Sequence, residues 1–247
     1  MSARPALVTG ADNPRGLGPA LALELARRGH RVAVTASRAA TLAEDLRAVG
    51  APAAAVLAVD LADPAALEPL LDDAAAALGA PLRALVNNAA HSTRDGFAAL
   101  DAATIDAHLA VNARAPMLLS AGLARRIAAA GEDGGGGRIV NVVSGQALGP
   151  MPGELAYTAS KGALETFTRQ LAAEVAGLGV TVNAVGPGPN DTGWIDDELR
   201  AALLPRFPLG RIGTPQDVAP LVGWLCGDEA AWVTGQVLHA EGGFLRT

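Results

Sequence analysis

Short apolar runs alternate with longer segments of helical character along the whole chain. The apolar runs lie at residues 6–9, 31–35, 54–59, 84–87, 138–143, 180–185 and 236–239. They are apolar at nearly every position, which is typical of strands that are buried on both faces. The segments with helical character lie at 16–28, 41–49, 64–78, 101–130, 156–176 and 215–226. This alternation predicts an α/β fold with a parallel sheet of about seven strands and helices on both faces.

Composition adds limits on partners and compartment. The chain has 247 residues, half of them apolar, and a net charge of -6, which argues against nucleic acid or an anionic membrane as the main partner. The single cysteine, Cys226, excludes an intrachain disulfide and is compatible with a cytoplasmic location. We see no signal peptide and no apolar run long enough to span a bilayer.

No change in composition marks a domain boundary, so we expect one domain over residues 1–247. The glycine-rich stretch at 131–137 is the one low-complexity segment of the sequence. We interpret it as a surface turn that follows the helix at 101–130.

Tyr157 and Lys161 lie four residues apart in a predicted helix, and Ser144 follows the apolar run at 138–143. A spacing of four places phenol and ammonium on one helix face. An ammonium about 4 Å away in a partly dry site contributes roughly 4 kcal/mol. That would lower the phenol pKa from about 10 by up to about three units, toward the range where acid–base catalysis works best. Ser144 would hold a substrate oxygen beside the phenol. Such a pair is common on helices, so its assignment depends on the neighbouring motifs.

Glycines occupy the turn between the first apolar run and the first helix, at Gly10, Gly16 and Gly18. In dinucleotide-binding folds, glycines in this turn let the backbone approach a pyrophosphate, and the helix N-terminus favours the anion. Alone, the glycines are a weak signal. They predict a nucleotide site only in combination with the residues at the end of the second strand.

The second apolar run ends without the carboxylate that would bind the ribose hydroxyls of NAD. Ser37 and Arg38 stand there instead and offer a hydroxyl and a charge to a 2′-phosphate, while Arg15 in the glycine loop adds a second cation. We therefore expect NADP(H) to be favoured over NAD(H) as cofactor.

These motifs together resemble those of the short-chain dehydrogenase/reductase family, including its carbonyl reductases and 3-oxoacyl reductases. The resemblance extends over essentially the whole chain, and both the order and the spacing of the motifs agree. The matching positions are Thr9-Gly10, Gly16-Leu17-Gly18, Asp60-Leu61, Asn87-Asn88-Ala89-Ala90, Asn112, Ser144, Tyr157, Lys161, Pro187-Gly188 and Thr192. The resemblance implies a Rossmann-type doubly wound domain with a substrate-loop segment at about 188–210.

The resemblance also implies a role for each matching residue. Ser144 orients the substrate oxygen, Tyr157 is the acid or base, and Lys161 lowers the tyrosine pKa and binds the nicotinamide ribose. Asn112 holds a water that links Lys161 to solvent. The remaining cofactor contacts it implies are Asp60 and Leu61 at the adenine, Asn88, Ala89 and Ala90 at the ribose, and Pro187, Gly188 and Thr192 at the nicotinamide. No metal is implied.

Two positions depart from the family pattern. Five residues separate Gly10 from Gly16, where the family usually has three, so we expect altered pyrophosphate contacts. Ala90 replaces the usual glycine and adds one methyl group near the cofactor.

We expect an NADPH-dependent reductase of ketones or aldehydes, with Tyr157 as proton donor. The alternatives are oxidation of a secondary alcohol with NAD(P), reduction of a 3-oxoacyl group on a carrier protein, and a non-catalytic NADP-binding regulator. A free substrate is preferred to a carrier-linked one because residues 131–134 and 176–179, at the ends of the two central helices, contain no lysine or arginine. Arginines that could substitute stand nearby at positions 125, 126, 138 and 169. Those two helices would pair chains into a homotetramer or homodimer.

The expected substrate pocket is mostly apolar with a few polar groups, which suits many small ketones. Its predicted wall comprises His91, Gln146, Leu148, Met151, Leu155 and the segment 190–209 with Trp194 and Phe207. His91 could bind substrate by a hydrogen bond, but a packed or solvent-facing histidine is the preferred interpretation.

Overall fold

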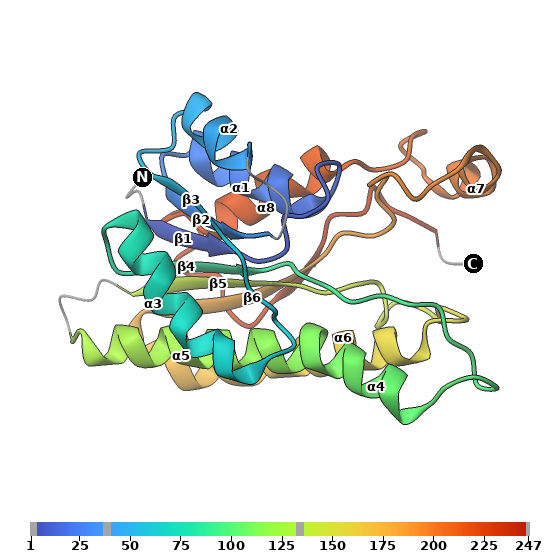
Figure 1. Cartoon of the computed structure of the whole chain (residues 1–247). Helices are drawn as coiled ribbons and strands as arrows, with labels where there is room; N and C mark the ends of the chain where they lie inside the picture. The colour runs from blue at the N-terminus through green and yellow to red at the C-terminus, as the bar shows by residue number, and fades with distance from the viewer. Residues whose placement is uncertain (1–3, 37–40, 132–135, 246–247) are drawn as a thin grey trace.

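The computed structural model describes residues 4–36, 41–131 and 136–245. In this part of the chain, seven parallel strands form one sheet in the order β3-β2-β1-β4-β5-β6-β7 (Figure 1). The strands are β1 (Pro5–Val8), β2 (Arg31–Thr35), β3 (Ala54–Leu57), β4 (Ala84–Asn87), β5 (Gly137–Val142), β6 (Val180–Gly186) and β7 (Val237–His239). The strand order reverses between β1 and β4, and ligands bind at such a switch point, beyond the carboxyl ends of the strands.

Helices cover both faces of the sheet, as the alternating pattern predicts. The α-helices are α1 (Leu17–Arg27), α2 (Leu42–Ala48), α3 (Leu67–Leu78), α4 (Ala102–Leu109), α5 (Ala115–Ala129), α6 (Leu155–Val175), α7 (Asp197–Leu203) and α8 (Pro215–Leu225). Figure 1 shows α1, α2 and α8 on one face and α3, α4, α5 and α6 on the other. The predicted doubly wound Rossmann-type fold is confirmed.

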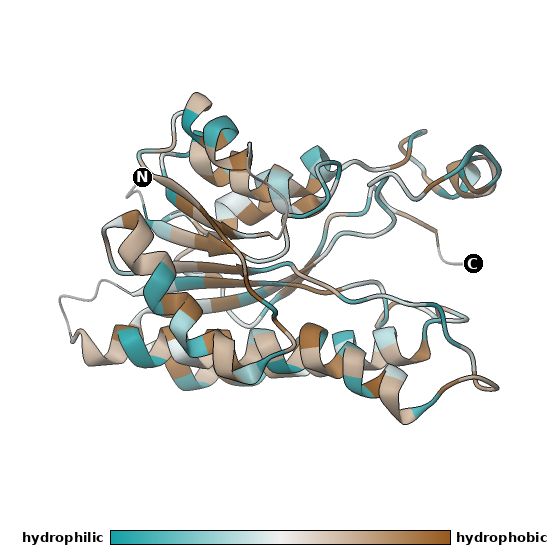
Figure 2. Ribbon diagram, viewed as in Figure 1, coloured by the Kyte–Doolittle hydropathy of each residue, from teal (hydrophilic) through white to brown (hydrophobic). Residues whose placement is uncertain are grey.

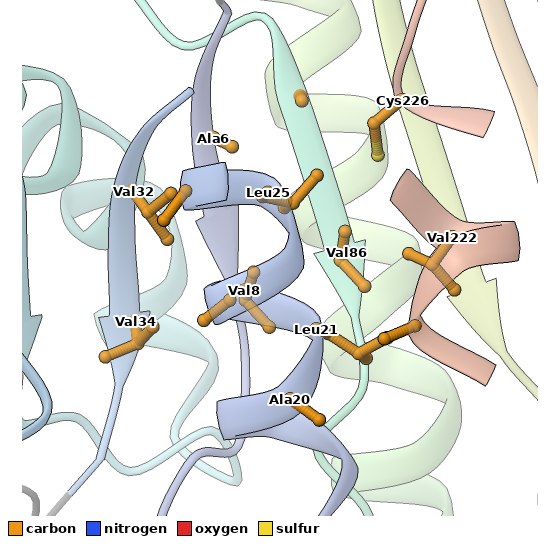
Figure 3. Close-up of a cluster of buried hydrophobic side chains, with 14 of the residues drawn as sticks. Ala6, Val8, Ala20, Leu21, Leu25, Val32, Val34, Val86, Val222 and Cys226 are labelled. Atoms are coloured by element: carbon orange, nitrogen blue, oxygen red, sulfur yellow. The ribbon is translucent and has the colours of Figure 1, made fainter. Parts of the chain in front are cut away.

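The core has two halves because successive side chains of a strand point to opposite faces. Ala6 and Val8 of β1 join the cluster under α1 and α8, whereas Leu7 joins the one under α3 and α5. Figure 3 shows the first cluster, in which Val222 and Cys226 face the strands. Apolar positions gather on the strands and on the helix sides toward them (Figure 2). Covering both faces explains why the strands are nearly continuous apolar runs.

Two elements differ from the sequence prediction. The single helix expected over 101–130 is interrupted by a π-helical segment, η2 (Ala110–Arg114), between α4 and α5. The substrate-loop segment at 188–210 contains α7, which sequence analysis missed. Asp196 caps α7, and its Oδ1 accepts a hydrogen bond from the Leu199 N–H at 2.8 Å. This helix lies beyond the end of the sheet (Figure 1). The turn predicted at 131–137 lies mostly outside the described residues.

Candidate active site

Helix α6 carries the predicted tyrosine–lysine pair in its first two turns. Lys161 is 2% exposed, and its Nζ donates a hydrogen bond to the carbonyl oxygen of Val142, the last residue of β5, at 2.8 Å. The same Nζ lies 5.8 Å from the centroid of the Tyr157 ring. The helix spacing therefore brings phenol and ammonium onto one face, and β5 fixes the ammonium.

The pKa values of this pair correct one prediction. Burial raises the pKa of Tyr157 above its ordinary value of 10; a hydrogen bond with Ser144 partly opposes this shift, and the charge of Glu154 adds to it. Burial lowers the pKa of Lys161 to about 8. The predicted lowering of the phenol pKa by a nearby ammonium is therefore wrong for this structure. Loss of hydration at the phenol outweighs the opposing contribution of Ser144.

Ser144 follows β5, and its side chain is close enough to the phenol to oppose the rise of the Tyr157 pKa. Its backbone N–H donates to Oε1 of Gln146 at 3.1 Å, and the Gln146 Nε2 donates to Oε2 of Glu165 at 2.5 Å. Glu165 is 7% exposed and also accepts from Arg169 at 2.7 Å. Both ends of the Gln146 amide are thus engaged with protein. Gln146 holds the serine loop, and the structure does not show it as a free substrate-binding group.

Asn112 lies in the middle of η2 and is fully buried. Its Oδ1 accepts the backbone N–H of His91 at 2.7 Å, and its Nδ2 donates to the His91 carbonyl at 2.8 Å and to Ser160 Oγ at 3.0 Å. Ser160 Oγ donates in turn to the Tyr157 carbonyl at 2.7 Å. The asparagine therefore links the segment after β4 to α6. The widened π-helical turn, a feature frequent at functional sites, is where its side chain makes this link.

Two histidine rings stand next to the tyrosine. The rings of His91 and His108 have centroids 4.7 Å apart, and the rings of His108 and Tyr157 have centroids 6.4 Å apart, both in edge-to-face arrangement. His108 is buried; its Nδ1 contacts the Thr104 carbonyl at 2.8 Å and its Nε2 accepts the Thr93 N–H at 3.2 Å, which places the proton on Nδ1. Burial lowers the pKa of His91, and the neighbouring His108 makes a further contribution in the same direction. His91 therefore lies beside the site as expected, with a neutral ring at pH 7.

A cavity of about 820 Å³ opens at the β1–β4 switch point, where a dinucleotide site is expected. Six predicted cofactor residues line it: Gly10, Asp60, Leu61, Asn88, Ala89 and Ala90. The first turn of α1 has Gly16 at its N-cap without a side-chain cap, so its amides can meet an anion. The residues present thus fit a dinucleotide.

The glycine loop packs tightly against its neighbours. A Cβ at Gly18 would lie 2.0 Å from the carbonyl oxygen of Gly10, and a Cβ at Gly10 would lie 2.6 Å from Cα of Ala89. The Asn88 Nδ2 donates to the carbonyls of Thr9 and Gly10 at 2.9 and 2.8 Å, tying the end of β4 to that of β1. These glycines are required by the close approach of backbone to backbone.

The longer glycine loop reaches the segment at 188–210. Asn13 Nδ2 donates to the Thr192 carbonyl at 3.0 Å, and Arg15 Nη2 lies 3.4 Å from Oδ1 of Asp191. Asp191 also pairs with Arg200 of α7. The observed partner of Arg15 is therefore a carboxylate of the substrate side, and its assignment to a 2′-phosphate stays a prediction. The predicted phosphate ligands Ser37 and Arg38 lie outside the described residues.

The other expected cofactor and pocket residues divide into two groups. Pro187, Gly188 and Thr192 follow β6, while Leu17 begins α1, so all four stand at the carboxyl ends of the strands. Of the pocket residues, Met151 receives a long contact of 3.8 Å from the Ser144 hydroxyl. Leu148, Leu155 and Trp194 are 44%, 41% and 53% exposed.

Phe207 is an exception among the predicted pocket residues. It is 3% exposed and packs with Ile195, Leu203 and Ile212 under α7. It belongs to the small core of the substrate-loop segment, so its prediction as pocket wall is wrong.

Sequence analysis missed Glu165, His108 and Asp95, whose side chains hold the site together. Spacing gave a signal for two of them. Glu165 stands four residues after Lys161 and His108 four residues before Asn112, so each shares a helix face with a predicted site residue. Asp95 has no such signal, because its partners are 60 and 61 residues away.

Comparison with known proteins gives one consistent family. A family model described as enoyl-(acyl carrier protein) reductase matches residues 10–245. An uncharacterized oxidoreductase, YjdA, from Bacillus subtilis (strain 168) is 45% identical over 98% of this chain and 96% of its own length. The NADPH-dependent aldehyde reductase-like chloroplastic protein of Arabidopsis thaliana is 35% identical over 99% of this chain and 95% of its own length.

A solved structure agrees with these relatives. Acetoin dehydrogenase from Enterobacter cloacae superposes with a TM-score of 0.86 at 34% identity, covering 99% of this chain and 96% of that one. The chain belongs to the short-chain dehydrogenase/reductase family. It is an oxidoreductase of the kind that acts on CH–OH and C=O groups. Within the described residues, no helix is long and apolar enough to cross a membrane.

Proposed function

We propose that this protein reduces the carbonyl group of a small, free ketone or aldehyde with NADPH, and that Tyr157 donates the proton. The observation that carries this proposal is the position of the buried Lys161, whose Nζ is held by the Val142 carbonyl and lies 5.8 Å from the centroid of the Tyr157 ring. When bound, NADPH supplies the hydride, and the protein supplies position and electrostatics.

Each residue of the pair has a role that follows from its surroundings. The raised pKa of Tyr157 keeps its phenol protonated at pH 7, which is the form that can donate to a developing alkoxide. Ser144, held by Gln146, orients the carbonyl oxygen toward the phenol. Lys161 remains largely protonated below its pKa of about 8 and stabilises the tyrosinate left after transfer.

The preference for NADPH is also part of the proposal. It is supported by the missing carboxylate after β2 and by the similarity to a relative described as an NADPH-dependent aldehyde reductase. The name of the matching family model keeps a carrier-linked acyl substrate as the second candidate. We also propose a cytoplasmic location.

The test is Tyr157→Phe, assayed with NADPH and with NADH against ketones, aldehydes, diketones and one β-ketoacyl thioester presented free and on a carrier protein. We expect turnover of the best substrate to fall by about 10²–10⁴-fold, the usual contribution of a positioned proton donor. Cofactor affinity, measured by fluorescence, should not change, because only one hydroxyl is removed.

Three outcomes would contradict the proposal. Near-normal turnover in Tyr157→Phe would exclude the tyrosine as proton donor. Better efficiency with NADH would overturn the cofactor preference. A strong preference for the carrier-bound thioester, lost at high salt, would favour the second candidate. Thr158→Ala is the matched control, since it removes a neighbouring hydroxyl that donates to the Leu155 carbonyl instead.

A further inference from the structure

The catalytic helix begins without a cap of its own. Glu154 occupies the N-cap position of α6 with φ -138° and ψ 43°, and its side chain makes no capping hydrogen bond. The first N–H groups of a helix have no partner within the helix and need one from elsewhere. In α6 this requirement concerns the turn that contains Tyr157.

The missing cap comes from a different part of the chain. The carboxylate of Asp95, in the segment after β4, accepts the N–H of Leu155 through Oδ1 at 2.6 Å and the N–H of Ala156 through Oδ2 at 2.8 Å. The backbone N–H of Asp95 also donates to the Gly153 carbonyl at 2.9 Å. Arg94 strengthens the contact, with Nη1 lying 3.4 Å from the Pro152 carbonyl and 3.6 Å from Oε1 of Glu154.

The capping segment is itself anchored to the rest of the site. Asn112 binds both the N–H and the carbonyl of His91. Thr93 donates its N–H to His108, whose ring stands edge-to-face against Tyr157. Residues 91–95 therefore form a brace, fixed at one end to η2 and α4 and at the other to the first turn of α6.

We propose that Asp95 is a positioning residue that sets Tyr157 against Ser144 by capping α6 from outside the helix. Tyr157 lies two residues after Leu155, within the capped turn. Lys161 lies one turn further on and is fixed independently by the Val142 carbonyl. Loss of the cap would therefore displace the phenol more than the lysine. This inference rests on the proposed role of Tyr157 as proton donor.

Geometry and charge can be separated at this position. Asparagine has one side-chain oxygen of the same reach, so it can accept from one of the two N–H groups that Asp95 binds, and it carries no charge. Asp95→Asn should therefore keep part of the cap, whereas Asp95→Ala removes it. If Asp95 acted through its charge on Tyr157, both variants would behave alike.

The chain offers a readout that does not depend on turnover, because Tyr157 is its only tyrosine. Tyrosinate absorbance, followed as pH rises, reports the ionisation of this phenol alone in the cofactor-free protein. The experiment combines that titration with kcat and with cofactor Kd for the unmodified protein, Asp95→Ala and Asp95→Asn.

For Asp95→Ala we expect kcat to fall about tenfold, as small misplacement of a reacting group costs rate. Cofactor Kd should be unchanged, and the phenol should titrate closer to its ordinary pKa because its enclosure loosens. Asp95→Asn, which keeps one of the two acceptors, should show clearly smaller changes of kcat and of the titration than Asp95→Ala. Thr214→Ala, which removes the N-cap of α8 away from the site, should leave both unchanged.

Unchanged kcat and titration in a folded Asp95→Ala protein would overturn the proposal, and so would an Asp95→Asn protein as impaired as Asp95→Ala. If Asp95→Ala does not fold, Asp95→Ser, which keeps one acceptor, must show smaller changes in the same directions. Should the unmodified protein turn over no carbonyl compound, the proposed function fails. The titration still decides the capping role in that case.

Discussion

Burial acts on Tyr157 and Lys161 in opposite directions because one is charged after losing a proton and the other before. The phenol pKa rises and the ammonium pKa falls, so each neutral form is favoured. Cys226 in the core under α8 shows the same effect, since burial raises the pKa of its thiol to about 12. A shifted pKa at one residue therefore shows, first of all, that the residue is buried. It indicates a chemical role only when neighbouring side chains such as Ser144 can take part in the reaction.

The pKa of Lys161 predicts how stability depends on pH. The value falls from its usual 10.5 to about 8 on folding, so between pH 8 and 10 the unfolded chain binds a proton that the folded protein has released. The free energy of unfolding should therefore rise with pH in this window. Compared with Lys161→Met, the gain should be roughly 1–3 kcal/mol over two pH units. Urea unfolding of both proteins at pH 7, 8, 9 and 10 measures this difference.

The comparison with Lys161→Met cancels the other groups that titrate in this range, including Cys226. Identical pH profiles for the two proteins would show that Lys161 keeps its ordinary pKa in the folded state. If the difference in free energy of unfolding between the two proteins fell as pH rises, the folded protein would bind the Lys161 proton more tightly than the unfolded chain does.

At the scale of elements, the active site is assembled by loops at the carboxyl ends of the strands. The segment after β4 braces α6, and the glycine loop after β1 contacts the segment after β6. Rigid strands and helices fix the ends of these loops, while side-chain contacts between loops fix their middles. This division is typical of sites on α/β folds.

The contact of the glycine loop with the substrate-loop segment can be tested through Arg15 and Asp191. Their side chains are 67% and 16% exposed, and ion pairs near the surface contribute little to global stability. Arg15→Ala should therefore leave global stability nearly unchanged but raise local opening of residues 190–210 by no more than about fivefold. Hydrogen exchange of that segment measures the opening.

Arg28→Ala is the control for this test, since it breaks the ion pair between Arg28, the C-cap residue of α1, and Glu24. Arg28→Ala should not change the rate of hydrogen exchange at residues 190–210. Equal exchange in Arg15→Ala and the unmodified protein would show that the pair does not hold the segment.

At the scale of the whole molecule, the sheet is covered on both faces but the outer surface keeps apolar side chains. Ile105 and Leu109 of α4 and Leu118 of α5 are 37%, 37% and 38% exposed. They lie on the helical layer that the family resemblance assigns to subunit contacts. Burying such side chains against a second copy would contribute about 25 cal/mol for each Å² removed from water.

We therefore expect a homodimer or homotetramer in solution through the α4–α5 and α6 layer. Light scattering at micromolar concentration should give a multiple of the chain mass of 24.8 kDa. Leu118→Arg should lower that mass, because it places a charge in the predicted interface. Leu204→Arg, at a residue 42% exposed in η5 (Leu204–Arg206), is the matched control and should leave the measured mass unchanged. A monomer in the unmodified protein would contradict the prediction.

The sequence alone determined the seven strands, most helices and the positions of Ser144, Tyr157 and Lys161. Apolar periodicity records which side of a segment is buried, and the four-residue spacing in α6 records a shared helix face, so both follow from local geometry. The glycine turn after β1 is readable for a similar reason, since only glycine tolerates the observed approach of Gly18 to the Gly10 carbonyl.

Only the tertiary structure decided which side chain satisfies each polar group. The cap of α6 is Asp95, the amide of Gln146 turns to Glu165, and Arg15 pairs with Asp191. Two of these contacts join residues 60 and 176 positions apart, and they depend on the paths of loops whose sequences show no periodicity. The shift of the Tyr157 pKa is also decided by the tertiary structure. Whether this pKa rises or falls depends on how completely the folded chain removes water from the phenol, and the spacing of residues in the sequence does not encode that burial.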